Sequence, residues 1–144
     1  ATYGSPTRTD IALVSERWGC EFRNWIKTVA SATPVFSYEF ADPKAPTTIF
    51  HVDEPVDGPF HNSDIPYVFQ RGYPNEQQAD APAWTPAQKA LSDRMLGYVA
   101  NFSKSGAPSA DWPKVETMVL HPEGDRIEAD AAFAKRHSCE LWQR

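Results

Sequence analysis

Positive charge is scarce in this sequence, and long hydrophobic runs are missing. Its 144 residues include 14 Lys and Arg against 19 Asp and Glu, a formal net charge of −5. Surfaces that bind nucleic acid or anionic membranes need clustered Lys and Arg, so this balance argues against both partners. No apolar run approaches the roughly 18 residues that a membrane-spanning helix requires. We therefore expect neither a nucleic-acid partner nor a membrane span.

Glycine is also scarce, whereas proline is abundant. The chain has 7 glycines and 13 prolines, and its proline share is about twice the usual ~5%. Because proline fixes φ and interrupts helices, we expect long extended connections and sharply bounded helices. The length allows one domain with its own core. The first residue is Ala1 rather than Met, so we expect a processed or excised piece of a longer protein.

The two cysteines, Cys20 and Cys139, lie far apart and form no C-x-x-C pair. This spacing argues against a zinc knuckle or a thioredoxin-like redox site. Two interpretations stay open: two unrelated buried thiols, or one long-range disulfide between the first and last helices, which would imply an oxidising compartment. The histidines are scattered without H-E-x-x-H or H-x-x-x-H spacing, so we expect neither a metal nor a cofactor.

The spacing of hydrophobic residues, together with the positions of proline, glycine and capping residues, predicts a mixture of helices and strands. The expected helices cover residues 10–32, 85–105 and 130–142, and the expected strands cover residues 34–40 and 115–121. Residues 41–58 and 70–84 are expected to be irregular connections. The helix over 85–105 has the clearest signals: Thr85 and Gln88 form a capping box, and Gly106 is a left-handed terminator. This order indicates an α/β architecture, although two strands alone make a marginal sheet.

Both long helices carry an apolar stripe. Thr9 or Asp10 is expected to cap the first helix, and Gly19 is a possible interruption. The stripe of the first helix consists of Ile11, Val14, Trp18, Phe22, Trp25, Ile26 and Val29. The stripe of the helix over 85–105 consists of Leu91, Met95, Tyr98, Val99 and Phe102. We expect both stripes to face a core.

The stretch GPFHNSDIPYVF, residues 58–69, combines a histidine with acid and aromatic residues. Pro59 and Pro66 exclude a long helix there, so we expect a loop with at most one short helical turn. His61 lies between Phe60 and the group Asn62-Ser63-Asp64. An imidazole on such a loop can act as a general base when its second nitrogen is held by a carboxylate.

This stretch resembles the histidine loop of the type B carboxylesterases, the cholinesterase-like branch of the α/β-hydrolases. Other segments resemble the same family in the same order, from residue 9 to residue 142: TDIALVSERWGC, PVFSYEF, TPAQKALSDRMLGYVANFSKSGAPSADWP, ETMVL and CELW. The resemblance implies an α/β fold class, the C-terminal portion of an α/β-hydrolase fold, with a few strands of a larger sheet. Residues 1–144 would then be part of one catalytic domain without an internal boundary.

The resemblance also implies an activity and site residues. It implies a serine hydrolase of carboxylic esters in which His61 is the catalytic histidine, with a small-molecule ester as substrate. Cys20 and Cys139 match a cysteine pair that is bridged in relatives, which implies a disulfide and a secreted or periplasmic location. We interpret Asp64, with Phe60, as support for the loop. Ile65, Tyr67 and Phe69 would support a pocket wall or pack in the core.

The sequence departs from the family pattern at several positions. Asn62 and Asp64 replace the more usual Gly and Glu, Val99 stands where relatives usually carry Trp, and Ser103 creates a glycosylation sequon at Asn101. The nucleophile motif G-x-S-x-G and the Gly-rich oxyanion stretch do not occur in these 144 residues. None of the acids before His61 matches a triad-acid motif.

In α/β-hydrolases the histidine follows the nucleophile and the acid, so this chain corresponds to a C-terminal part. We expect it to be inactive alone and to need the missing N-terminal portion of the same domain as its partner. Two alternatives remain: a non-catalytic cholinesterase-like binding or adhesion module, and a free-standing small α/β domain.

Overall fold

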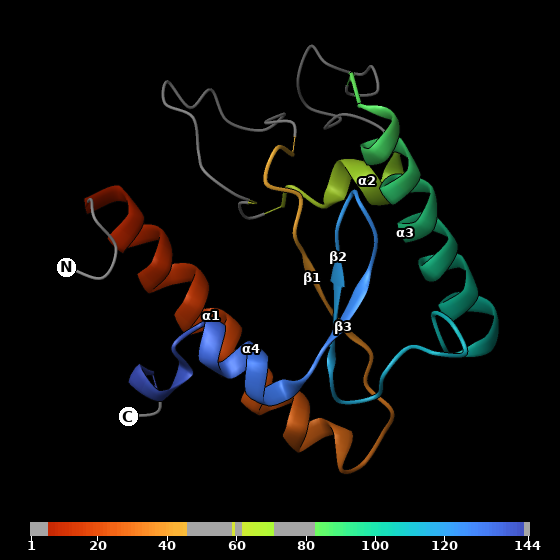
Figure 1. Cartoon of the computed structure of the whole chain (residues 1–144). Coiled ribbons are helices and arrows are strands. Elements are labelled where there is room, and N and C mark those ends of the chain that lie inside the picture. The colour runs from red at the N-terminus through yellow and green to blue at the C-terminus, as the bar shows by residue number, and fades with distance from the viewer. Residues whose placement is uncertain (1–5, 46–58, 60–61, 71–82, 143–144) are drawn as a thin grey trace. The chain divides into compact units, whose positions relative to one another are not determined.

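The structure, a computed structural model, describes residues 6–45, 59, 62–70 and 83–142 (Figure 1). These residues form two compact units, each assembled from segments distant in sequence. The first unit comprises Ala1–Ser37, Pro113–Thr117 and Glu128–Arg144, and the second comprises Tyr38–Trp112 and Met118–Ile127. Most of the two predicted connections, residues 41–58 and 70–84, lies outside the described residues.

The first unit is built on α1 (Pro6–Ala30), with α4 (Asp130–Arg136) and the 3-10 turn η1 (Cys139–Leu141). Helix α1 begins at Pro6, so the predicted cap at Thr9 or Asp10 is wrong. Proline is well tolerated in a first helical turn, where its missing N–H would have no partner anyway. The predicted interruption at Gly19 is also wrong, because α1 continues through it.

The last predicted helix, residues 130–142, is interrupted. Helix α4 ends at Arg136, and Ser138 adopts a left-handed conformation with φ of 50°. The chain then resumes as η1, which brings Cys139 against α1. Cys20, Phe133 and Cys139 form the buried core of this unit, with Ala134 and Trp142 packed against it.

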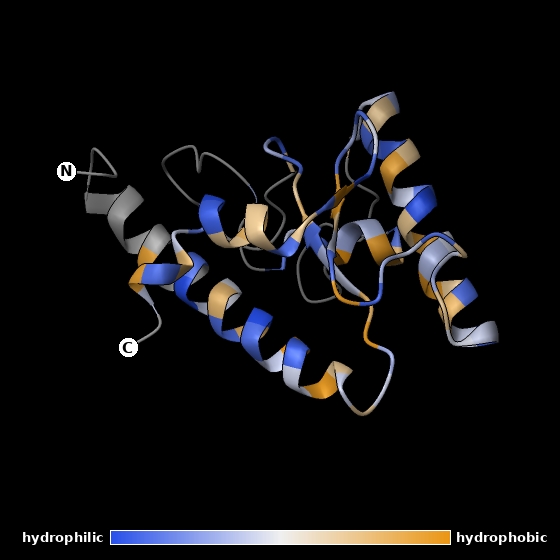
Figure 2. Ribbon diagram, turned by 60° about the horizontal axis from the view of Figure 1, so that its bottom comes forward, coloured by the Kyte–Doolittle hydropathy of each residue, from blue (hydrophilic) through white to orange (hydrophobic). Residues whose placement is uncertain are grey.

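The second unit contains most of a three-stranded sheet with the order β1-β2-β3. Its strands are β1 (Ser37–Phe40), β2 (Thr117–Leu120) and β3 (Arg126–Glu128). The sheet therefore has one strand more than we predicted, because three residues with mixed polarity give β3 no detectable alternation. Strand β1 is shorter than predicted and starts at Ser37. Strand β2 is the most hydrophobic of the three (Figure 2).

Helix α3 (Pro86–Ser105) confirms its sequence signals in detail. The Gln88 N–H donates to Thr85 Oγ1 at 3.2 Å, and the Thr85 N–H donates to Gln88 Oε1 at 2.9 Å. Gly106 ends the helix with φ of 76°, a conformation that favours glycine. The predicted stripe is buried only in part: Leu91 and Met95 are buried, whereas Val99 and Phe102 are 47% and 50% exposed.

The core of the second unit lies between β2 and the helices α2 (Ile65–Phe69) and α3. Helix α2 is the short helical turn expected within residues 58–69, and it packs against α3. The buried apolar residues of this unit are Tyr67, Leu91, Met95, Trp112, Met118, Val119 and Leu120. In the part of the chain that the structure covers, every helix is too short or too polar to cross a membrane.

Candidate functional site

The proposed catalytic histidine, His61, and its neighbour Phe60 lie outside the described residues. The structure instead describes both flanks of their segment. One flank contains Asp42 and follows β1. The other flank begins at Asn62 and precedes α2. Apart from Pro59, these two flanks contain the described residues nearest to His61 in the sequence.

Asn62 begins the described part of the leaving flank in a left-handed conformation, with φ of 71°. The Ile65 N–H donates to the Asn62 carbonyl at 3.1 Å and closes a turn. Glycine adopts positive φ most easily, and asparagine is among the best tolerated of the other residues. Asparagine is therefore well suited to the left-handed turn at this position.

Asp64 joins this flank to the sheet. The Tyr38 hydroxyl, on β1, donates to Asp64 Oδ2 at 2.8 Å. The Asp64 side chain makes no capping hydrogen bond at the start of α2, although it stands at the N-cap position. Desolvation, followed by the charge of the Asp64 carboxylate, raises the pKa of Tyr38, so this hydroxyl stays protonated and remains a donor. Asp64 therefore fixes the start of α2 against β1.

Asp42 joins the two flanks through a buried network that the sequence analysis missed. Its side chain is only 2% exposed. Asp42 Oδ2 accepts hydrogen bonds from the Tyr67 hydroxyl at 2.5 Å and from Gln88 Nε2 at 2.8 Å. Asp42 Oδ1 accepts from the Lys44 N–H at 2.9 Å, and Gln88 Nε2 also donates to the Lys44 carbonyl at 2.9 Å. One carboxylate thus connects the end of β1, helix α2 and the first turn of α3.

The Asp42 network has one sequence signal in retrospect. Asp42 precedes Pro43, and an aspartate that accepts from the N–H two residues later forms a common turn.

Burial, followed by the hydrogen bond to Asp42, raises the pKa of Tyr67 and keeps its hydroxyl protonated. The three donors to Asp42 are neutral, so hydrogen bonds compensate the burial of this carboxylate.

Tyr67 is the packing centre of the second unit and has no exposed surface. Its ring contacts Phe40 edge-on, with ring centroids 4.9 Å apart, and lies 5.3 Å from Trp84. Its carbonyl accepts a hydrogen bond from Ser92 Oγ at 2.7 Å. Of the two expected roles for Tyr67, core packing is the observed one. Phe69 does not pack in the core, since it is 70% exposed.

A second polar cluster fixes the turn between β2 and β3 to α3. Arg94 donates to both carboxylate oxygens of Asp125, from Nε at 2.9 Å and from Nη2 at 3.0 Å. The Tyr98 hydroxyl donates to Asp125 Oδ2 at 2.8 Å. Burial and this hydrogen bond raise the pKa of Tyr98 to about 12. All these groups are used in the fold, so the cluster is structural.

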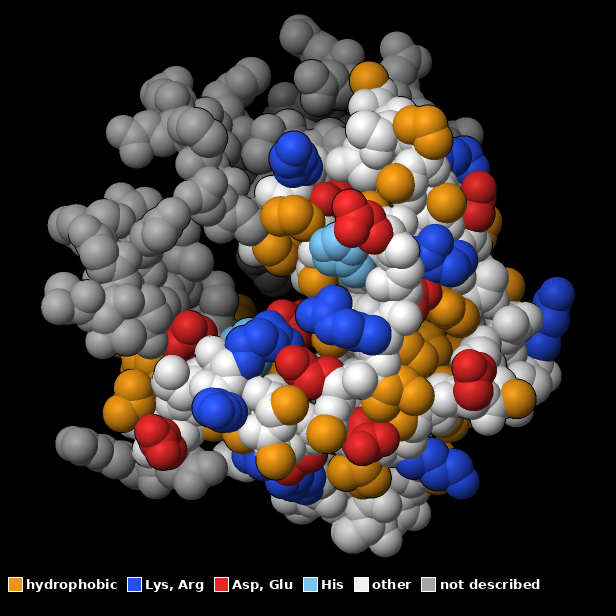
Figure 3. Space-filling model, viewed as in Figure 1, with side chains coloured by type: hydrophobic (Ala, Val, Ile, Leu, Met, Phe, Trp, Pro, Cys, Tyr) orange, Lys and Arg blue, Asp and Glu red, His pale blue; other side chains and the backbone are white. Residues whose placement is uncertain are grey.

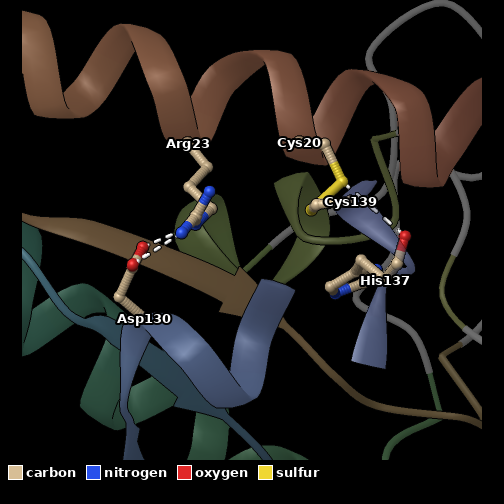
Figure 4. The surroundings of a disulfide bond; sticks show 5 residues. All are labelled: Cys20, Arg23, Asp130, His137 and Cys139. Carbon is tan, nitrogen blue, oxygen red and sulfur yellow. Dashed lines mark hydrogen bonds and ion pairs between the residues drawn. A yellow bond between two sulfur atoms is a disulfide. The ribbon is translucent and has the colours of Figure 1, made fainter. Parts of the chain in front are cut away.

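In the first unit, a disulfide joins Cys20 of α1 to Cys139 of η1 across 119 residues of sequence (Figure 4). Asp130 accepts hydrogen bonds from Arg23 at 2.5 and 2.6 Å and from Lys27 at 2.7 Å. The hydrogen bond from Arg23 is the main cause of the lowered pKa of Asp130. Covalent and ionic contacts therefore hold α4 and η1 to the same side of α1.

The described residues offer no group of three or more His, Cys, Asp or Glu side chains that could hold a metal ion. On the molecular face drawn in Figure 3, acidic and basic side chains are interspersed without a large field of one sign. The main feature of this region is the pair of described flanks of the histidine segment, which are joined by the hydrogen bonds of Asp64 and Asp42.

The strands and helices form part of an α/β-hydrolase fold. An esterase from Clostridium hathewayi that can hydrolyse aliphatic aromatic polyesters matches with a TM-score of 0.61 and 21% identity, over 85% of this chain and 23% of that one. A PNB esterase matches with a TM-score of 0.51 and 27% identity, over 76% of this chain and 22% of that one.

The family follows from the sequence. The model of the carboxylesterase family matches residues 11–142, and the chain belongs to this family. Human cocaine esterase is 24% identical over 118 residues, which are 79% of this chain and 20% of that protein. Bovine carboxylesterase 4A is 27% identical over 115 residues, which are 77% of this chain and 19% of that protein. The chain thus spans about one fifth of the length of the curated relatives it matches.

Proposed function

We propose that this chain is the C-terminal part of a carboxylic-ester hydrolase and that His61 is its catalytic histidine. The nucleophilic serine and the triad acid belong to the portion of the domain outside these 144 residues. The observation that carries the proposal is the family match across residues 11–142, which includes the histidine loop. In this proposal both compact units belong to one catalytic domain, with no domain boundary between them.

His61 acts as an acid–base group in two half-reactions. The serine hydroxyl attacks the ester carbonyl while His61 accepts its proton, and His61 then protonates the departing alkoxide to release the alcohol. Water attacks the acyl-enzyme with His61 again as the base, and the serine recovers its proton as the acid is released. The chain needs no cofactor for this chemistry, and a small-molecule ester is the substrate.

The anchored flanks support this role because a general base must be held within hydrogen-bond reach of the proton it takes. Asp64 lies three residues after His61 and is held by Tyr38. Asp42 and Tyr67 join the two ends of the segment that contains His61. We assign Asp64 as a positioning residue, with Phe60 as further support for the loop.

The disulfide supports a secreted or periplasmic location, because such bonds persist in oxidising compartments. Asn101, the acceptor of the sequon, lies inside α3, and its side-chain nitrogen donates to the Pro108 carbonyl at 3.1 Å. An engaged amide within a helix disfavours glycosylation at this position.

The test is ester hydrolysis by the full-length polypeptide that contains these residues. We expect His61→Ala to lower kcat for a p-nitrophenyl ester by about 10⁴-fold or more. His121→Ala is the matched control and should retain near-normal kcat, because His121 lies at the end of β2 and binds the Glu123 N–H. The isolated chain should be inactive, and turnover by it that His61→Ala abolishes would contradict the fragment proposal.

The same experiment addresses the alternative of a binding or adhesion module. A full-length protein with Gly or Ala in place of the serine of G-x-S-x-G, and without ester hydrolysis, would establish that alternative. An intact G-x-S-x-G motif together with hydrolysis that depends on His61 supports the esterase.

A further inference from the structure

Helix α2 follows His61 closely in the sequence, and its own residues do little to hold it in place. It has only five residues, Ile65–Phe69, whereas isolated helices shorter than about 12 residues are marginal in water. Asp64, at its N-cap position, makes no capping hydrogen bond. Within the described residues, the buried Oγ of Ser63 also has no hydrogen-bond partner. The position of α2 therefore depends on its contacts with the rest of the second unit.

These contacts converge on Tyr67, which has no exposed surface. Its hydroxyl donates to Asp42 Oδ2, and its carbonyl accepts a hydrogen bond from Ser92 Oγ of α3. Asp42 is itself fixed, because it accepts from Gln88 Nε2 and from the Lys44 N–H. The Asp42 carboxylate is thus the point at which α2 is joined to the end of β1 and to the first turn of α3.

The chemistry at Asp42 requires a carboxylate. The Tyr67 hydroxyl and Gln88 Nε2 both donate to Oδ2, and the Lys44 N–H donates to Oδ1. An asparagine would turn its NH2 group toward either the Gln88 amide nitrogen or the Lys44 N–H, and neither of these groups accepts a hydrogen bond. Asp42→Asn therefore weakens this junction while it nearly preserves the shape of the side chain.

A movement of α2 reaches His61 through the backbone. One peptide bond joins His61 to Asn62, so their Cα atoms are at most about 3.8 Å apart. The Asn62 carbonyl is tied to α2 by the hydrogen bond from the Ile65 N–H. A general base must lie within hydrogen-bond reach of the proton that it takes, and a displacement of 1 Å can cost about 100-fold in rate.

We propose that Asp42 is a positioning residue for His61 and that it acts through Tyr67 and α2. The proposal rests on the proposed function, in which His61 is the catalytic histidine. Asp42 fixes the place from which His61 takes the proton of the serine and returns it to the leaving alkoxide. Asp64 holds the same flank at another point, because it accepts a hydrogen bond from Tyr38.

The experiment compares two acetate esters in the full-length polypeptide. p-Nitrophenolate departs without a proton, whereas the alkoxide from ethyl acetate must receive one from His61. The ratio of kcat/KM for ethyl acetate to kcat/KM for p-nitrophenyl acetate therefore reports how well His61 is placed for proton transfer. A smaller folded fraction lowers both values equally, so a loss of stability alone leaves this ratio unchanged.

We expect Tyr67→Phe and Asp42→Asn each to lower the ratio at least about 5-fold at a temperature where the variants are folded. Tyr98→Phe is the matched control, because it removes the same hydroxyl from another Tyr–Asp pair of the second unit. Its ratio should stay within about 2-fold of the wild-type value. An unchanged ratio in either network variant, or an equal fall in Tyr98→Phe, would overturn the proposal. If Asp42→Asn does not fold, Tyr67→Phe decides, because it keeps the ring.

The positioning role and the proposed function fail in different ways. Normal activity of His61→Ala toward both esters would contradict the catalytic assignment. An inactive His61→Ala together with wild-type ratios in Asp42→Asn and Tyr67→Phe would keep that assignment and overturn the positioning role.

Discussion

Tyr67→Phe tests the buried network that joins the flanks of the histidine segment. The substitution removes one hydroxyl and keeps the ring, so the packing against Phe40 and Trp84 is preserved. The lost hydrogen bond, 2.5 Å long in the structure, ends on a carboxylate that is 2% exposed. A hydrogen bond to a charged group contributes about 1.5–3 kcal/mol. We therefore expect a loss of about 2 kcal/mol, or about a 30-fold larger unfolding constant.

The assay is urea denaturation of the full-length protein, read by pulse proteolysis. A double-mutant cycle with Asp42→Asn isolates the pair, and we expect a coupling energy of about 1 kcal/mol or more. Tyr98→Phe is the comparison. We expect it to lower the free energy of unfolding less than Tyr67→Phe does, because Asp125 keeps both hydrogen bonds from Arg94. Additive effects of Tyr67→Phe and Asp42→Asn would refute a direct interaction between the two side chains.

Three further results are expected in the full-length protein. Because φ is 71° at Asn62, Asn62→Gly should keep or improve stability, whereas Asn62→Val should destabilise the protein by about 1–2 kcal/mol. Equal melting temperatures of these two variants would contradict the left-handed turn. Replacing both Cys20 and Cys139 by Ser should cost up to about 5 kcal/mol in the chain-entropy model for a separation of 119 residues, and two free thiols in the denatured, unreduced protein would contradict the bond. The pKa of Asp130 is lowered in the folded protein, so the ionised side chain stabilises the fold at pH values above its ordinary pKa of 3.8. This stabilisation disappears as the pH falls through the lowered pKa. The stability difference between wild type and Asp130→Asn should thus shrink between pH 6 and pH 2, and a constant difference would contradict the pairing with Arg23.

Local signals predicted the parts of the fold that local interactions determine. The capping box at Thr85 and the terminator Gly106 set the bounds of α3, because each signal acts within one helical turn. Pro59 and Pro66 limited α2 to one short helix. These features depend on neighbours in the sequence, so a single sequence is sufficient to find them.

The features that the sequence did not predict depend on contacts between residues that are distant in sequence. Strand β3 is three residues long and exists because β2 pairs with it. The left-handed residue Ser138 separates α4 from η1, where Cys139 bonds to Cys20, and no local pattern marks this interruption of the predicted helix. The buried network of Asp42 was not predicted because two of its donors, Tyr67 and Gln88, follow far along the chain.

The resemblance to a family supplied what local patterns could not. It assigned a role to the histidine segment and paired the cysteines that spacing alone left open. The apolar stripe of α1 lies on one side of the helix as expected, but Trp18, Phe22 and Trp25 are not part of the buried core of the first unit. A helix pattern predicts an apolar face, and only the structure identifies which face is already covered.

The most direct test of the central claim is chemical rescue of the histidine. Full-length His61→Gly is assayed with a p-nitrophenyl ester while imidazole is added, with the same imidazole series on the wild type as the control. If His61 is the general base, His61→Gly has almost no activity and free imidazole restores part of it in proportion to its concentration. Normal activity of His61→Gly without imidazole would contradict the account.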